Sequence, residues 1–117
     1  MQTTIKQLAH QFFSEIQAIR HHIHAHPELS FQEFETAQFI SNKLNEFGIE
    51  HKTGVAGTGI VALIKGKNPD HNCIALRADM DALPILEAND CSYASKNKGV
   101  MHACGHDVHS ACLLGAA

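Results

Sequence analysis

The sequence has 117 residues, of which 44% are hydrophobic, and a formal net charge of -3 at pH 7. This composition supports a buried core and excludes a disordered tail, and no cluster of Lys and Arg indicates a nucleic-acid or anionic membrane partner. No apolar run approaches the roughly 18 residues that a membrane-spanning helix needs. Residues 1–13 lack the basic leader and apolar stretch of a secretory signal. We therefore expect a soluble, cytoplasmic protein.

Histidine is the outlier of the composition, with ten copies that fall mainly at 21–26 and 102–109. The four cysteines are Cys73, Cys91, Cys104 and Cys112. Without a secretory signal, free thiols are a better expectation than disulfides, and a metal ligand or catalytic group is the better use for one of them. The histidine clusters are the first indication of metal chemistry.

Two helices are predicted in the first part of the chain. Apolar residues recur every three or four positions from Ile5 to Ile23, and Pro27 disfavours a helical His26, so the first helix should end near His24. The second should start at Ser30, because Ser30 and Glu33 have the spacing of a capping box. Its predicted buried face and C′ glycine are Phe34, Ala37, Ile40, Leu44, Phe47 and Gly48.

Beyond this point short strands are predicted. Residues 49–53 form one candidate, followed by a turn at 54–57. The apolar runs 59–65 and 73–78, separated by a turn-forming stretch, are predicted to form a hairpin that helices cover on both faces. Residues 79–103 are expected to be irregular, and a last helix should begin at about Asp107 as N-cap. This order of elements indicates an α/β fold.

The stretch MHACGHDVH at residues 101–109 carries candidate metal ligands. Cys104 and His106 are two apart, so in an extended segment both side chains point to the same side. A thiolate and an imidazole are ligands for zinc or a related ion, and Gly105 lets the backbone approach it. Asp107 could hydrogen-bond a ligand imidazole. The spacing alone fits a buried free thiol beside hydrogen-bonded histidines equally well.

Asp79 and Asp81 directly follow the predicted strand 73–78. The carboxyl ends of strands are where open α/β sheets place their ligand crevices. The pair therefore suits metal binding or the orientation of a metal-bound histidine. The alternative is a pair of turn-forming aspartates before Pro84.

Three runs of sequence in series carry a family resemblance. They are RHHIHAHPELSFQE at 20–33, ALRADMDALP at 75–84, and GVMHACGHD at 99–107 followed by LLGAA at 113–117. In this order and spacing the chain resembles the M20 family, in the branch of hippurate hydrolase, N-acyl-L-amino-acid amidohydrolases, N-acetyldiaminopimelate deacetylase and plant auxin-conjugate hydrolases.

The resemblance implies a fold and a site. Residues 1–117 would be the N-terminal part of an M20-type, zinc-peptidase-like catalytic domain, an α/β fold with a mixed sheet flanked by helices. The rest of that domain and the lid domain would be absent. Such a domain holds two divalent ions (Zn, Mn, Co or Ni). By match to the family, Cys104 and His106 are its first two metal ligands, and Asp81 is a carboxylate that orients a ligand. Asp79 stands where other branches have a metal-binding histidine.

The resemblance also covers the HPE stretch. His24, His26, Pro27 and Glu28 match a motif that we interpret as structural. The competing interpretation is a helical metal pair of His22 and His26. It is disfavoured because Pro27 should end the helix.

The implied activity is metal-dependent hydrolysis of the amide bond of N-acyl amino acids, by a homo-oligomer. The family's general base and later histidine ligands would follow residue 117, so the chain alone should be inactive. Glu87 is a candidate base only by position. A rival hypothesis is a non-catalytic module that folds and self-associates. A redox module using Cys104 and Cys112 is least favoured because no C-x-x-C is present.

Overall fold

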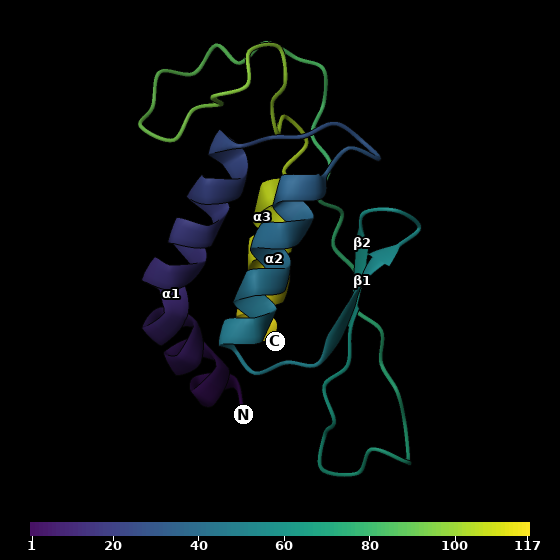
Figure 1. Ribbon diagram of the computed structural model, residues 1–117. Coiled ribbons are helices and arrows are strands. Elements are labelled where there is room, and N and C mark those ends of the chain that lie inside the picture. Colours follow the sequence, from purple (N-terminus) through teal and green to yellow (C-terminus); the bar gives the residue numbers. More distant parts are fainter.

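The computed structural model describes all 117 residues as three helices and one β-hairpin. The elements are α1 (Gln2–Ala25), α2 (Phe34–Glu46), β1 (His51–Val55), β2 (Gly59–Ala62) and α3 (His106–Ala116). The helices lie side by side with α3 behind α2, and the hairpin stands beside α2 (Figure 1). A long connection without helix or strand runs from 63 to 105. None of the helices combines the length and apolar character that crossing a membrane requires.

The core forms where the three helices meet. It consists of Ile19 and Ile23 from α1, Leu44 from α2, and Ala111 and Leu114 from α3. The helices α1 and α3 approach closely at Gly115, where an added Cβ would lie 2.3 Å from Ile16 Cδ1. The predicted apolar stripe of α1 is therefore buried only in its C-terminal half. Ile5, Leu8 and Phe12 are exposed because they lie beyond the end of α3.

The end of α1 agrees with the sequence. The helix ends at Ala25, one residue beyond the predicted His24, and His26 is its C-cap. Pro27 follows directly and is fully buried.

The predicted start of α2 at Ser30 is wrong, and so is the capping box. The helix begins at Phe34, because a turn with Phe31 at a φ of 63° occupies the preceding residues. Glu33 is the N-cap residue, but its side chain makes no capping hydrogen bond; its carboxylate accepts a hydrogen bond from Thr58 Oγ1 at 2.7 Å. The carboxylate of Glu28 accepts hydrogen bonds from the backbone N–H of Glu35 (3.1 Å) and Thr36 (2.7 Å) instead. A negative charge at this end also complements the helix dipole.

The predicted hairpin of 59–65 with 73–78 is also wrong. The strands that pair are β1 and β2, antiparallel, with a bulge between Lys52 and Val55. Their turn is short because Gly57, at a φ of 104°, reverses the chain within three residues. Residues 73–78 form no strand, and Ile74 is 84% exposed. The sheet of residues 1–117 is two-stranded and antiparallel, and its arrangement with the helices agrees with the expected partial α/β domain.

The irregular stretch 79–103 was predicted correctly, and two isolated bridges order it. Ala82 pairs with Leu29, and Leu83 pairs with Met101. These bridges bring the D-x-D segment beside the residues that precede α3. That helix starts at His106, with Gly105 as N-cap at a φ of 87°, so Asp107 lies in the first turn and is not the predicted cap.

Candidate metal centre

Asp81 and His106 form the centre of the candidate site. The Nδ1–H of His106 donates to the carboxylate Oδ1 and the main-chain oxygen of Asp81, both at 2.9 Å. Both partners can only accept, so the proton is on Nδ1 and Nε2 keeps its lone pair. A metal-binding histidine is usually oriented in this way by a carboxylate or a carbonyl. Both side chains are partly exposed, 21% for His106 and 26% for Asp81. The donor set therefore fits a metal at Nε2.

Cys104 lies in the turn directly before α3 and is an exposed free thiol. The segment 104–106 is not extended, because Gly105 adopts a left-handed conformation between the two candidate ligands. The argument that both side chains point to one side of an extended segment therefore does not hold. The pairing of Cys104 with His106 on a metal stays a prediction that rests on the family resemblance.

Asp79 is not joined to Asp81 and His106. Its carboxylate pairs with Arg77, with both Nε and Nη2 of the guanidinium at 2.8 Å from Oδ1. Its main-chain oxygen accepts from Ser110 Oγ at 3.0 Å. No three His, Cys, Asp or Glu side chains of the chain come together as a metal site. The role of Asp79 as a metal ligand stays a prediction.

Asp107 makes its hydrogen bonds to side chains of α1 and not to a ligand imidazole. Its carboxylate is buried and accepts from Arg20 Nε and His24 Nδ1, both at 2.8 Å. Burial alone would raise the pKa of Asp107, but the hydrogen bonds from His24 and Arg20 and the positive charge of Arg20 lower it. The expected hydrogen bond from a ligand imidazole N–H to the Asp107 carboxylate is thus absent. The residue instead anchors the first turn of α3, which begins with His106, to α1.

The same network extends to Glu87. Its Oε1 lies 3.0 Å from His24 Nε2 and 3.0 Å from Asn89 Nδ2, and its Oε2 accepts from the backbone N–H of Ser95. Burial opposes the charge, yet these hydrogen bonds lower the pKa of Glu87 to about 2. A carboxylate with that pKa accepts a proton poorly at neutral pH. Glu87 is therefore unsuited to the role of general base.

Sequence reasoning missed the network of Arg20, His24, Asp107 and Glu87. A signal was available: Arg20 and His24 are four residues apart on α1 and lie directly beside its apolar residues Ile19 and Ile23. Charged groups on a buried face require partners. The His24 and Glu28 contacts agree with the structural interpretation of the HPE stretch.

His102 is the remaining histidine of the second cluster near the site. It is 3% exposed, and neither ring nitrogen has a hydrogen-bond partner. Burial lowers the pKa of His102, so the ring is neutral. It makes no hydrogen bond to Asp81 or His106.

Comparisons with known proteins show what the chain is similar to. Residues 75–117, which include both candidate motifs of the centre, match peptidase family M20/M25/M40. The chain is 51% identical over 113 residues to an N-acyl-L-amino acid amidohydrolase of Geobacillus stearothermophilus, covering 97% of this chain and 30% of that protein. It is 50% identical to hippurate hydrolase of Campylobacter jejuni, covering 88% of this chain and 27% of the relative.

The fold has solved counterparts as well. The structure of the Bacillus subtilis YXEP protein, described as a dinuclear metal-binding peptidase of the M20 family, matches with a TM-score of 0.84 and 47% identity. The match covers 89% of this chain and 29% of that one, so the chain spans less than a third of its relatives. With the fold and both motifs in agreement, the chain belongs to peptidase family M20.

Proposed function

We propose that a full-length protein carrying this chain is a metal-dependent amidohydrolase that splits N-acyl amino acids into a carboxylic acid and a free amino acid. The observation that carries the proposal is the Asp81–His106 pair, which leaves Nε2 of His106 free to bind a metal. Support for the substrate class comes from the identity to an N-acyl-L-amino acid amidohydrolase.

In this proposal Cys104 and His106 bind metal, and Asp81 fixes the tautomer and orientation of His106. A pair of divalent ions (Zn, Mn, Co or Ni) would lower the pKa of a bound water and polarise the amide carbonyl. Asp79 is a third candidate ligand, and it would have to exchange its contact with Arg77 for the metal. Because the pKa of Glu87 is lowered to about 2, we propose that the proton acceptor lies outside residues 1–117. Residues 1–117, as part of a catalytic domain, should therefore be inactive alone.

The test compares purified full-length protein with the 117-residue chain on N-acetyl and N-benzoyl amino acids. We expect turnover by the full-length protein only, its loss with chelator, and its recovery with added metal. Asp81→Ala should weaken metal binding by roughly 10–100-fold, as loss of such a positioning partner usually does. Asp70→Ala, at an exposed aspartate, is the matched control. Chelator-sensitive turnover by the short chain would show that the base has been misplaced.

A second candidate function, a non-catalytic module that self-associates, is favoured by one observation. Several large apolar side chains of the segment 61–76 are exposed: Val61, Leu63, Ile64, Ile74 and Leu76. We propose homo-oligomers in either case. Turnover by the full-length protein distinguishes the two functions: an amidohydrolase turns over N-acyl amino acids, and a non-catalytic module does not. All four cysteines are free thiols, which fits a reducing compartment, so we propose the cytoplasm.

A further inference from the structure

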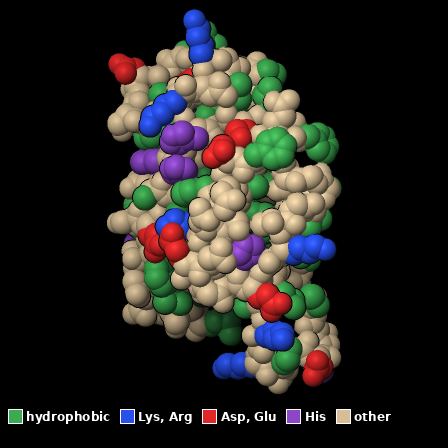
Figure 2. Space-filling model, in the orientation of Figure 1, with side chains coloured by type: hydrophobic (Ala, Val, Ile, Leu, Met, Phe, Trp, Pro, Cys, Tyr) green, Lys and Arg blue, Asp and Glu red, His purple; other side chains and the backbone are tan.

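A second pair of imidazoles lies at the end of α1, away from Asp81 and His106. His22 and His26 are four residues apart, and their ring centroids are 4.5 Å from each other with the planes tilted by 33°. Pro27 was expected to break this spacing, but the helix persists to Ala25, and the ring of His26, the C-cap residue, lies beside that of His22. Histidine side chains gather on the surface near this end of α1, beside Lys or Arg side chains (Figure 2).

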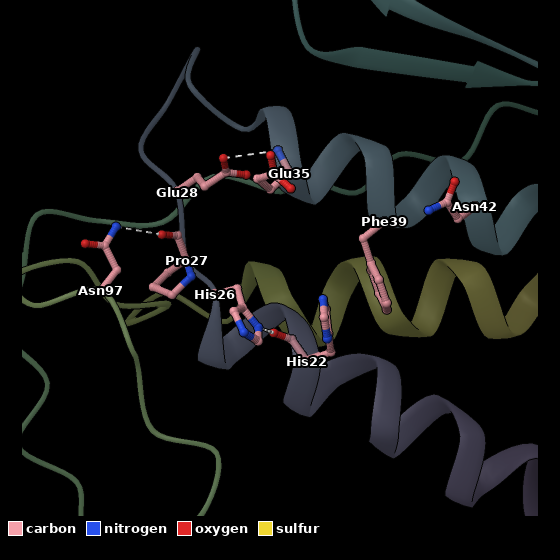
Figure 3. A pocket seen from close by; sticks show the side chains of 8 residues that line it. All are labelled: His22, His26, Pro27, Glu28, Glu35, Phe39, Asn42 and Asn97. Carbon is pink, nitrogen blue, oxygen red and sulfur yellow. Dashed lines mark hydrogen bonds between the residues drawn. The ribbon is translucent and has the colours of Figure 1, made fainter.

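The ring of His26 is held in one tautomer. Its Nδ1–H donates to the main-chain oxygen of His22 at 2.8 Å (Figure 3). A carbonyl only accepts, so Nδ1 carries the proton and Nε2 keeps its lone pair. A backbone carbonyl is one of the usual partners that orient a metal-binding histidine.

His22 is positioned and kept neutral by its neighbours. The ring stacks on Phe39, with centroids 4.0 Å apart and planes 17° from parallel, and neither nitrogen makes a hydrogen bond. Partial burial of the ring, followed by the positive charges of His26, Lys96 and Lys43, lowers the pKa of His22. A neutral imidazole ring offers a nitrogen lone pair to a metal ion.

The space around the two rings is open. They line a cavity of about 410 Å³ together with Glu28, Glu35, Phe39 and Asn42 among others (Figure 3). The Glu28 carboxylate is occupied by the N-terminus of α2, whereas that of Glu35 accepts no hydrogen bond. The cavity has room for water molecules, which can complete a coordination shell.

We propose that His22 and His26 together bind one divalent transition-metal ion of the Zn²⁺, Ni²⁺ and Cu²⁺ group. Imidazole nitrogens suit these ions, whereas Ca²⁺ and Mg²⁺ prefer oxygen ligands. Two histidines at i and i+4 on one helix face are a spacing at which both reach the same ion. This site shares no residue with the proposed amidohydrolase centre, so either can exist without the other.

The experiment titrates Ni²⁺ into the chain by calorimetry, without thiol reductants that bind metal. Cys104→Ser with His106→Asn is the common background, so the proposed catalytic ligands do not contribute. Addition of His22→Gln and His26→Gln should abolish one equivalent of binding. Either single change should weaken affinity by at least about tenfold, because losing a ligand costs at least as much as losing the partner that orients it. The matched control adds His10→Gln and His71→Gln, at two exposed histidines, and should bind as the background does.

A second readout needs no variant. In NMR spectra of the unaltered chain, substoichiometric Ni²⁺ should broaden the ring signals of His22 and His26, while those of His10 and His71 stay sharp. Equal Ni²⁺ binding by the His22/His26 variant and the control, or broadening of the other histidines with His22 and His26 unaffected, would overturn the inference.

Discussion

At the scale of single residues, the buried ring of His24 is held between two carboxylates. Both of its ring nitrogens face carboxylate oxygens, Asp107 at 2.8 Å and Glu87 at 3.0 Å. Carboxylates only accept hydrogen bonds, so both nitrogens donate and the ring carries a positive charge between two negative ones. A buried charge pattern of this kind is sensitive to the loss of one member.

His24→Ala should therefore lower the free energy of unfolding by about 3–5 kcal/mol, because it leaves two buried carboxylates without their common partner. The measurement is equilibrium unfolding in urea at neutral pH. His10→Ala, at an exposed histidine of the same helix, should stay within about 0.5 kcal/mol of the original chain. Similar values for the two variants would mean that the network does not form in solution.

Glu87 makes the free energy of unfolding depend on pH in the acidic range. Its pKa falls from the usual 4.5 to about 2 in the folded chain, so folding favours the ionised form. The resulting stabilisation is fully present above about pH 4.5 and is lost as the pH falls toward 2. Urea unfolding at several pH values should show this decline. Glu87→Gln should flatten it and Glu50→Gln, at an exposed position, should not; equal slopes in both variants would contradict the assignment.

At the scale of elements, the N-terminus of α2 depends on a residue six positions before it. Glu28→Ala should cost about 1–2 kcal/mol of unfolding free energy, because it removes the acceptor for two backbone N–H groups and a favourable charge at the helix N-terminus. Ser30→Ala should have an effect near zero, since Ser30 caps nothing here. Hydrogen exchange at Thr36 N–H reports the cap directly. A larger loss of unfolding free energy in the Ser30 variant than in the Glu28 variant would indicate that Ser30 and Glu33 do form a capping box.

The helices were predictable from sequence because their evidence is local. Apolar spacing, Pro27 and Gly48 each act within a few residues, and Gly48 indeed follows α2 at a φ of 70°. The Glu28 cap was missed because it depends on the turn around Phe31, which the sequence pattern does not reveal. The pairing of 73–78 was wrong because an apolar run shows that a segment needs cover but not which segment supplies it.

The candidate site, too, was predictable from the sequence only in part. The family resemblance predicted that Asp81 orients a metal ligand. The structure brings Asp81 into contact with His106, and the role of both at a metal stays a prediction. The contact of Arg20 with Asp107 spans 87 positions in sequence, and no local pattern indicates it. The expected partner of Asp107 was wrong for that reason.

At the scale of the whole molecule, the exposed apolar surface predicts self-association. Its centre lies in the segment 61–76, where Ile74 and Leu76 are 84% and 69% exposed, while α3 buries Ser110, Ala111 and Leu114. Because burial of each such side chain recovers roughly 1.5–3 kcal/mol, dimers or larger species should appear as concentration rises.

Sedimentation velocity over a concentration series measures this self-association. Ile74→Lys with Leu76→Lys should shift the chain toward monomer, and Ile5→Lys with Leu8→Lys, on the exposed start of α1, is the comparison. A monomer at every concentration for the unaltered chain would refute the association. If only the Ile5/Leu8 variant lost self-association, the interface would lie on α1 and not on the segment 61–76.

The core that joins Ile19 and Ile23 to Ala111 and Leu114 also constrains the order of events during synthesis. The ribosome releases α1 first and α3 roughly 80 residues later, and α1 has to wait for its main packing partner. Until then the apolar face of α1, together with Arg20 and His24, is open to water or to a chaperone. Folding of this chain is consequently late and dominated by a contact of high sequence separation, although most of its regular structure is helical.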